Sequence, residues 1–160
     1  MNIMIMSDTH FRKDFSLEEP VLDAISAADM IIHCGDFTGY EFFSFLESTG
    51  KLTAVLGNND FRLHEFLPYE QNLNIEGYRI TITHGHTCST GTVHLKYAGS
   101  DIIILGHTHH PSVEEFDGKL ILNPGSLTWN RYCDMNSFIT MRIEKGTRPE
   151  ARIHYQNKGA

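Results

Sequence analysis

Short apolar runs that each end in a cluster of polar side chains are the feature that most restricts the fold of this 160-residue chain. The first three runs alternate with segments of helical spacing, the order of a β-α-β-α-β unit with a parallel sheet. In such sheets, ligand sites lie beyond the carboxyl ends of the strands. The clusters are Asp8-Thr9-His10, Gly35-Asp36, Gly57-Asn58-Asn59-Asp60, His84-Gly85-His86 and Gly106-His107-Thr108-His109.

The apolar spacing also predicts the elements. We expect strands over 2–6, 30–34 and 52–56, helices over 16–28 and 37–48, a hairpin of 73–75 with 78–83, a short helix over 91–97, a strand over 101–105, a hairpin of 113–116 with 119–122, and final strands over 137–143 and 151–155. Pro20 suits the first turn of its helix, and Asp117-Gly118 is a two-residue hairpin turn signal. The predicted fold is one α/β domain over 1–160. It has two mixed β-sheets packed face to face with helices on the outer faces, a four-layer α/β/β/α sandwich.

Composition narrows the class of protein. Hydrophobic residues make up 41% and charged residues 21% of the chain, which is typical of a globular protein. A net charge of −7 disfavours a broad nucleic-acid surface. Three cysteines (Cys34, Cys88 and Cys133) without a CxxC pair favour a reducing cytosol. We therefore expect a cytoplasmic protein, and no apolar run is long enough for a membrane span. The oligomeric state, including a homo-oligomer, stays open.

The clusters offer seven side chains with mixed oxygen and nitrogen donors and no thiolate. They are Asp8, His10, Asp36, Asn58, His84, His107 and His109. Such a set suits Mn²⁺, Fe²⁺, Ni²⁺ or Zn²⁺ better than Ca²⁺ or Mg²⁺ alone. Seven ligands exceed one four-ligand site and fit two metals that share a carboxylate. Two metals about 3.5–4 Å apart are the usual device for hydrolysing phosphate esters.

These motifs resemble the calcineurin-like metallophosphoesterase superfamily, whose pattern is D-x-H, G-D, G-N-H-[DE], a lone His and G-H-x-H. The short length and the segments at 83–86 and 123–126 are similar to its small YfcE/MJ0936-type phosphodiesterase branch, with a resemblance from residue 1 to about 155. The resemblance implies one metal on Asp8, His10 and His109, a second on Asn58, His84 and His107, and Asp36 between them. The expected cofactors are two divalent ions per chain, Mn²⁺ first, with Ni²⁺, Fe²⁺ or Zn²⁺ as alternatives.

The activity that the resemblance implies is hydrolysis of phosphodiesters, or of monoesters, by in-line attack of a hydroxide that bridges the metals. The expected partner is a small phosphorylated substrate. One alternative is a non-catalytic interaction scaffold, because a eukaryotic retromer subunit shares the fold of this branch. Another is a nuclease or nucleotide hydrolase with the same site, which differs only in pocket shape.

Further roles are predicted around the metals. Asp36, Asn58 and His86 are the expected catalytic residues, and Asn59, His86 and Arg131 the expected substrate contacts. His110 could contact substrate or support a ligand, and Asn123 is expected to close the loop beside the metals. We expect structural or surface roles for His33, His64, His94 and His154. Asn59 stands where the superfamily often has a histidine. An amide cannot supply a proton, so the leaving-group acid stays open.

Overall fold

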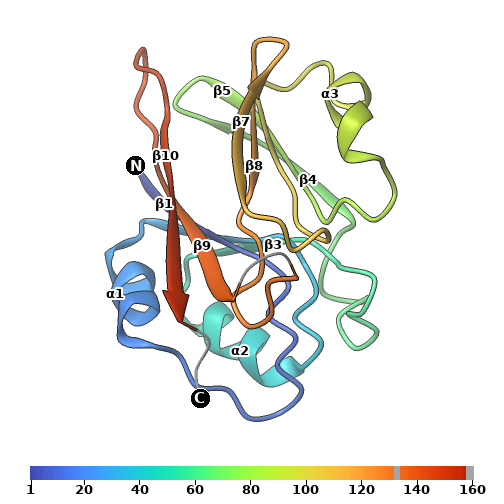
Figure 1. Cartoon of the computed structure of the whole chain (residues 1–160), viewed down its shortest axis with the longest axis vertical. Helices are drawn as coiled ribbons and strands as arrows, with labels where there is room; N and C mark the ends of the chain where they lie inside the picture. The colour runs from blue at the N-terminus through green and yellow to red at the C-terminus, as the bar shows by residue number, and fades with distance from the viewer. Residues whose placement is uncertain (132–133, 158–160) are drawn as a thin grey trace.

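The computed structural model of the chain describes residues 1–131 and 134–157, so Cys133 lies outside it. Ten strands form two five-stranded sheets (Figure 1). The first sheet has the order β10-β9-β1-β2-β3. Its strands are β1 (Asn2–Met6), β2 (Met30–His33), β3 (Leu52–Ala54), β9 (Met135–Arg142) and β10 (Glu150–Asn157). Strands β1, β2 and β3 are parallel, as predicted, and β9 joins β1 in the antiparallel sense.

The second sheet has the order β4-β5-β6-β8-β7. Its strands are β4 (Glu70–Ile75), β5 (Tyr78–Thr83), β6 (Ile102–Ile104), β7 (Ser112–Phe116) and β8 (Lys119–Asn123). The two hairpins, β4 with β5 and β7 with β8, are antiparallel, and β6 pairs in parallel with β5 on one side and β8 on the other. The helices are α1 (Glu19–Ala27), α2 (Tyr40–Ser48) and α3 (Val93–Lys96), the last preceded by the 3₁₀ helix η1 (Thr90–Thr92).

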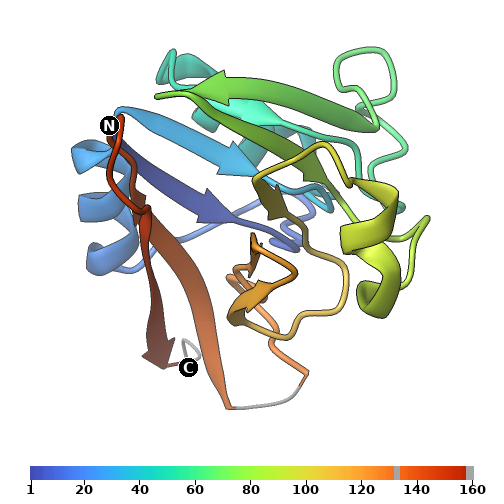
Figure 2. The same ribbon diagram turned by 90° about the horizontal axis from the view of Figure 1, so that it is seen from above.

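Side-chain alternation along the strands produces the layers. Ile3 and Ile5 of β1 pack between the sheets with Ile104 of β6. Met4 and Met6 of β1 point to the opposite face and pack in the cluster beneath α1 and α2. Ile103 of β6 packs with Val93 of α3 on the outer face of the second sheet. Figure 2 shows α1 and α3 on opposite sides of the two sheets, so the predicted four-layer fold is confirmed.

The predicted start of the second helix is wrong: this helix begins at Tyr40, not at residue 37. Asp36 and Thr38 have φ angles of 61° and 69°, which a right-handed helix cannot include. Phe37 instead stacks on the ring of buried His33, with centroids 3.5 Å apart. Asp36 therefore lies in the loop between β2 and α2 and not at the start of the helix. Among the described residues, no helix is long and apolar enough to cross a membrane.

Candidate metal centre

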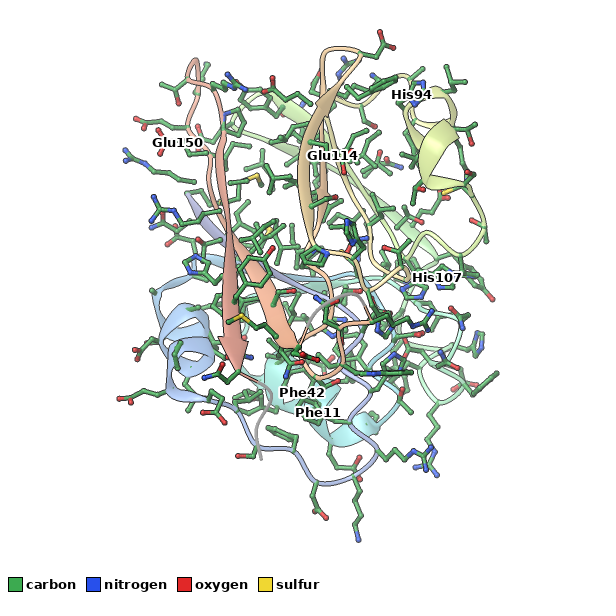
Figure 3. All side chains as sticks on the ribbon, in the orientation of Figure 1. Phe11, Phe42, His94, His107, Glu114 and Glu150 are labelled. Carbon is green, nitrogen blue, oxygen red and sulfur yellow. The ribbon has the colours of Figure 1, made fainter. Side chains whose placement is uncertain are left out.

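The predicted ligands come from both sheets and meet beyond the ends of their strands. Asp8 and His10 follow β1, Asp36 follows β2 and Asn58 follows β3, while His84 and His107 follow β5 and β6 of the other sheet. Figure 3 shows His107 well separated from His94, which we expected to lie outside the site. Two groups of potential ligand atoms result, the first from Asp8, His10 and His109 and the second from Asp8, Asp36 and His84.

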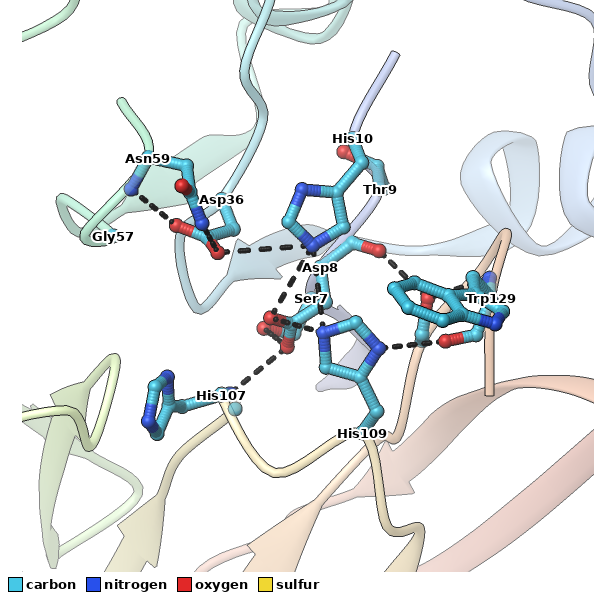
Figure 4. A network of polar contacts seen from close by, with 12 residues as sticks. Ser7, Asp8, Thr9, His10, Asp36, Gly57, Asn59, His107, His109 and Trp129 are labelled. Carbon is cyan, nitrogen blue, oxygen red and sulfur yellow. Dashed lines mark hydrogen bonds and ion pairs between the residues drawn. The ribbon is translucent and has the colours of Figure 1, made fainter. Parts of the chain in front are cut away.

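The first group is centred on a buried carboxylate oxygen (Figure 4). Oδ1 of Asp8 lies 3.1 Å from Nε2 of His109 and 3.9 Å from Nε2 of His10. Nδ1 of His109 lies 2.6 Å from the carbonyl oxygen of Trp129, so this nitrogen is the donor and Nε2 keeps its lone pair. Among the described residues, Oδ1 of Asp8 then has no hydrogen-bond donor. The charge of this buried oxygen is balanced only by a cation between Oδ1 and Nε2. That cation is either a second proton on His109 or a metal ion.

Electrostatics in this group agree with that geometry. Burial alone would lower the pKa of His109, but the adjacent Asp8 carboxylate outweighs burial and raises it. Burial would raise the pKa of Asp8, but His109 and His84 lower it overall. Asp8 is thus held as an anion facing imidazoles, an environment that suits a divalent cation.

The second group is built around buried His84. Its Nδ1 donates to the carbonyl oxygen of Cys34, 2.7 Å away, which leaves Nε2 unprotonated. Nε2 lies 3.0 Å from Oδ1 of Asn58 and 3.6 Å from Oδ1 of Asp36. Three electron-pair donors therefore converge without a proton to share. In both groups, unprotonated ring nitrogens face carboxylate or amide oxygens, so the residues fit metal ions.

Asp36 belongs to the second group and also faces His10 of the first. Its Oδ1 faces His84 at 3.6 Å, and its Oδ2 faces Nε2 of His10 at 3.7 Å. Asn59 donates its backbone N–H to Oδ1 at 2.8 Å and its side-chain amide to Oδ2 at 2.6 Å. The carboxylate plane is thereby fixed with one oxygen toward each group. The amide of Asn59, which we expected to contact substrate, thus holds Asp36.

His107 is placed differently from the other predicted ligands. Its backbone N–H donates to Oδ2 of Asp8 at 2.9 Å. Its ring centroid lies 5.1 Å from that of His84, and the ring is absent from both groups of His, Cys, Asp and Glu ligand atoms found among the described residues. Its role as a ligand stays a prediction.

The other predicted residues surround the centre. The ring of His86 lies 5.4 Å from that of His84, and its Nδ1 is buried without a partner among the described residues. The amide nitrogen of Asn123 donates to the carbonyl of Gly106 and to Oγ1 of Thr108, both at 3.0 Å, so it closes that loop. His110 lines a pocket with Thr108 and Asn123. Arg131 lies over the Trp129 ring, 5.5 Å from its centroid.

The histidines expected outside the site have other surroundings. His33 is buried, His64 and His94 lie against Tyr69 and Phe116, and His154 stacks on Phe138.

Backbone strain is concentrated in the ligand loops. The φ angles are 52° at Asp8, 48° at His10, 61° at Asp36, 66° at His107 and 58° at His109. Such left-handed conformations cost non-glycine residues on the order of 1–3 kcal/mol each and cluster at functional sites. No sequence pattern revealed this strain.

Two supporting residues were missed by sequence reasoning. Asp60 is buried and accepts the backbone N–H groups of Asp36, Thr38 and Gly57 at 2.7, 2.8 and 2.8 Å. It ties the loops after β2 and β3 together. The hydroxyl of Ser126 donates to the carbonyl of Asp8 at 2.7 Å. Both residues belong to motifs that we had recognised, the acidic fourth position of 57–60 and the end of 123–126, so the signal was present.

Comparison with known proteins shows which family the chain resembles. Residues 1–146 match the calcineurin-like phosphoesterase superfamily domain. The chain is 36% identical over 151 residues to probable metallophosphoesterase MJ0623 of Methanocaldococcus jannaschii, covering 90% of this chain and 77% of that one. It is 33% identical over 138 residues to phosphodiesterase MJ0936 of the same organism, covering 78% and 83%. The structure of Vps29 from Chaetomium thermophilum superposes with a TM-score of 0.79 at 17% identity, covering 98% and 97% of the chains, a likeness of fold alone.

Proposed function

Because the chain belongs to the calcineurin-like phosphoesterase superfamily, we propose that it hydrolyses small phosphodiesters at a centre of two divalent metal ions. Asp8, His10 and His109 would hold one ion, and Asn58, His84 and His107 the other, with Asp36 shared. We infer Mn²⁺ as the working ion, because the donors combine carboxylate and amide oxygens with imidazoles. A cytoplasmic location belongs to the same proposal.

The placement of Asp36 carries this proposal. Its two oxygens face imidazoles of different groups, at 3.6 and 3.7 Å. A carboxylate placed in this way offsets the repulsion between two cations. The buried, donorless Oδ1 of Asp8 supports a cation on the same side of the site.

The chemistry divides between the ions and the protein. Bound divalent ions lower the pKa of water and neutralise charge that develops on phosphate oxygens. In the reaction the oxygen of water bonds to phosphorus, the ester P–O bond breaks, and the leaving oxygen takes up a proton. Carbonyl acceptors hold His84 and His109 in the tautomer that leaves Nε2 unprotonated. His86, beside His84, is the nearby imidazole that we assign to substrate contact.

The test is a substrate panel on chelated and metal-reconstituted protein. Aryl phosphodiesters should be hydrolysed faster than aryl monoesters, chelation should abolish turnover, and Mn²⁺ should restore it better than Ni²⁺, Fe²⁺ or Zn²⁺. Full activity after metal removal, verified by elemental analysis, would overturn the proposal. Two bound ions per chain with no hydrolysis of any ester would instead favour the interaction scaffold.

A further inference from the structure

A cleft of about 530 Å³ lies beside the metal centre. It is lined by His10, Arg12, Thr38, Asn59, Phe61, Arg62, Trp129 and Arg131. His10 and Asn59 belong to the centre, since one is a predicted ligand and the other holds Asp36. Whatever fills the cleft is therefore adjacent to the phosphate that reacts. Its volume falls in the range of ordinary small-ligand sites, about 300–1,000 Å³.

The cleft gathers positive charge on an acidic protein. The whole chain carries a net charge of −7, yet Arg12, Arg62 and Arg131 line this one cleft. None of the three forms an ion pair with a carboxylate of residues 1–131 or 134–157. Three of the four described arginines elsewhere do form such pairs: Arg79 with Asp101, Arg142 with Glu144 and Arg148 with Glu115. Three exposed guanidinium groups without carboxylate partners favour a bound anion, and their planar fork suits phosphate.

The cleft also exposes two aromatic rings to solvent. Phe61 is 76% exposed and Trp129 is 57% exposed. Arg131 lies 5.5 Å above the centroid of the Trp129 ring, and the Trp129 ring meets that of His109 edge-on at 5.8 Å. Aromatic faces combined with arginine are the platforms on which proteins stack nucleobases. The same cleft thus offers contacts for an anion and for a planar ring.

We propose that this cleft binds a nucleoside and one further phosphate of a short nucleotidyl phosphodiester. The inference rests on the proposed function and names its substrate class. Arg12, Arg62 and Arg131 hold a phosphate other than the one that reacts, and Phe61 and Trp129 hold the base. The enzyme then acts on dinucleotides, trinucleotides or dinucleoside polyphosphates. The net charge of −7 disfavours long nucleic acids as the main substrates, because their binding depends on many contacts between basic residues and phosphates.

The binding test uses the single tryptophan of the chain, which is Trp129 itself. The full chain, with and without Zn²⁺, is titrated at fixed ionic strength with adenosine 3′,5′-bisphosphate, and with inorganic pyrophosphate as the anion lacking a base. We expect the nucleotide, but not pyrophosphate, to quench the fluorescence of Trp129 in a saturable way. The double variant Arg12→Ala/Arg62→Ala should weaken nucleotide binding at least about 10-fold, as expected for lost charge-assisted hydrogen bonds. Phe61→Ala should weaken it about 10-fold through lost stacking.

Matched controls lie outside the cleft. Arg142→Ala/Arg152→Ala removes two exposed arginine charges, as the double cleft variant does, and Phe116→Ala removes an exposed ring on β7. Both should leave the nucleotide affinity within about twofold of the wild type, well below the loss expected from a direct contact. Quenching that is absent, that pyrophosphate reproduces, or that the cleft variants leave unchanged would overturn the inference.

A kinetic comparison separates this inference from the proposed function. The quantity is the ratio of kcat/KM for a 5′-phosphorylated dinucleotide to kcat/KM for an aryl phosphodiester. We expect the ratio to fall at least about 10-fold in Arg12→Ala/Arg62→Ala. Hydrolysis of the aryl ester with an unchanged ratio overturns the cleft assignment and leaves the proposed function standing. Nucleotide binding without hydrolysis of any diester overturns the proposed function and supports the cleft assignment.

Discussion

Asn59 donates hydrogen bonds to both carboxylate oxygens of Asp36, from its backbone at 2.8 Å and from its side chain at 2.6 Å. The loop after β3 therefore sets the orientation of the carboxylate that follows β2. One oxygen is turned toward His84 and the other toward His10, the orientation in which Asp36 would serve the two proposed ions. Changes in either loop should therefore reach both ions.

Asp36→Asn should be the most damaging single change at the centre. It removes the charge that faces both His84 and His10 and places an amide nitrogen beside one of these rings, so both proposed ions should bind more weakly. His86→Ala should cost less, roughly 10–100-fold in kcat/KM, because it alters a residue beside a ligand. Metal content per chain and kcat/KM are measured for both variants, with exposed Asp23→Asn on α1 as the control. Two ions retained in Asp36→Asn would contradict a shared role.

Asp60→Asn should weaken metal binding although Asp60 lies in neither ligand group. Its carboxylate accepts three backbone N–H groups, and an asparagine would turn its own donors toward some of them. We expect a loss of about 1–3 kcal/mol in the free energy of unfolding from the unsatisfied groups. A lower metal affinity should accompany it, because the loop that carries Asp36 loosens. Urea unfolding and metal titration check this. Unchanged metal affinity would show that Asp60 contributes to the stability of the fold and not to metal binding.

Gly106→Ala should disturb the centre by a steric clash. An added Cβ would lie 1.9 Å from Oγ of Ser7, the hydroxyl that donates to Oδ2 of Asp8 at 2.6 Å. We expect a destabilisation of about 1–3 kcal/mol, typical of overpacking in a buried region. Gly99→Ala is the control, since its Cβ would meet nothing within 4 Å. Ser7→Ala combined with Gly106→Ala should recover part of the loss, measured by urea unfolding. If the double variant recovers no stability, the clash of the added Cβ with the Ser7 hydroxyl is not the cause of the destabilisation.

Much of this arrangement could be predicted because strand ends and turn chemistry are local. The Asp117-Gly118 turn joins β7 to β8 with φ angles of 51° and 71°, as a two-residue hairpin loop requires. The meeting of Asp8 with Asp36 follows from the parallel pairing of β1 with β2.

The missed features are non-local. The three acceptor contacts of Asp60 depend on how two loops meet. The cleft joins Arg12, Arg62 and Arg131, which no motif connects. The left-handed φ angles of the ligands are uncommon for residues other than glycine, and no motif in the sequence specifies them.

His33 should make stability depend on pH below neutrality. Burial lowers the pKa of His33 to about 3, and its Nδ1 already accepts the N–H of Gly35 at 3.1 Å. An unfolded histidine has a pKa of about 6.5. Between these values the unfolded chain binds a proton that the folded chain refuses, so stability falls as pH falls from about 6.5 toward 3.

The matched variant for this prediction is His33→Gln, whose amide can donate to Thr9 and accept from Gly35 without titrating. Between pH 6 and pH 4, the wild type should lose about 1.4 kcal/mol more per pH unit than the variant. Chemical unfolding of metal-free protein at several pH values measures both slopes. Equal slopes would mean that His33 is protonated in the folded state.

The native asparagine at position 59, where the superfamily often has a histidine, should make the hydrolysis rate depend strongly on the leaving group. An amide supplies no proton, and its nitrogen is engaged with Asp36. Without an acid, the barrier depends on how well the leaving oxygen carries negative charge, and a general acid is commonly worth about 10²–10⁴-fold. Aryl esters of acidic phenols should turn over well and alkyl esters poorly. A plot of log kcat/KM against leaving-group pKa should therefore be steep for the wild type.

Asn59→His adds a titratable donor to the cleft. Asn59→Ala is the control, because both variants lose the hydrogen bond that the side-chain amide of Asn59 donates to Asp36. The histidine variant should exceed the alanine variant most for poor leaving groups, so its plot should be flatter. Identical slopes in the two variants would show that an imidazole at this position does not reach the leaving oxygen. A flat wild-type plot, with chemistry shown to be rate-limiting, would mean that another group supplies the proton. His86, whose Nδ1 has no partner among the described residues, would then be the first to replace.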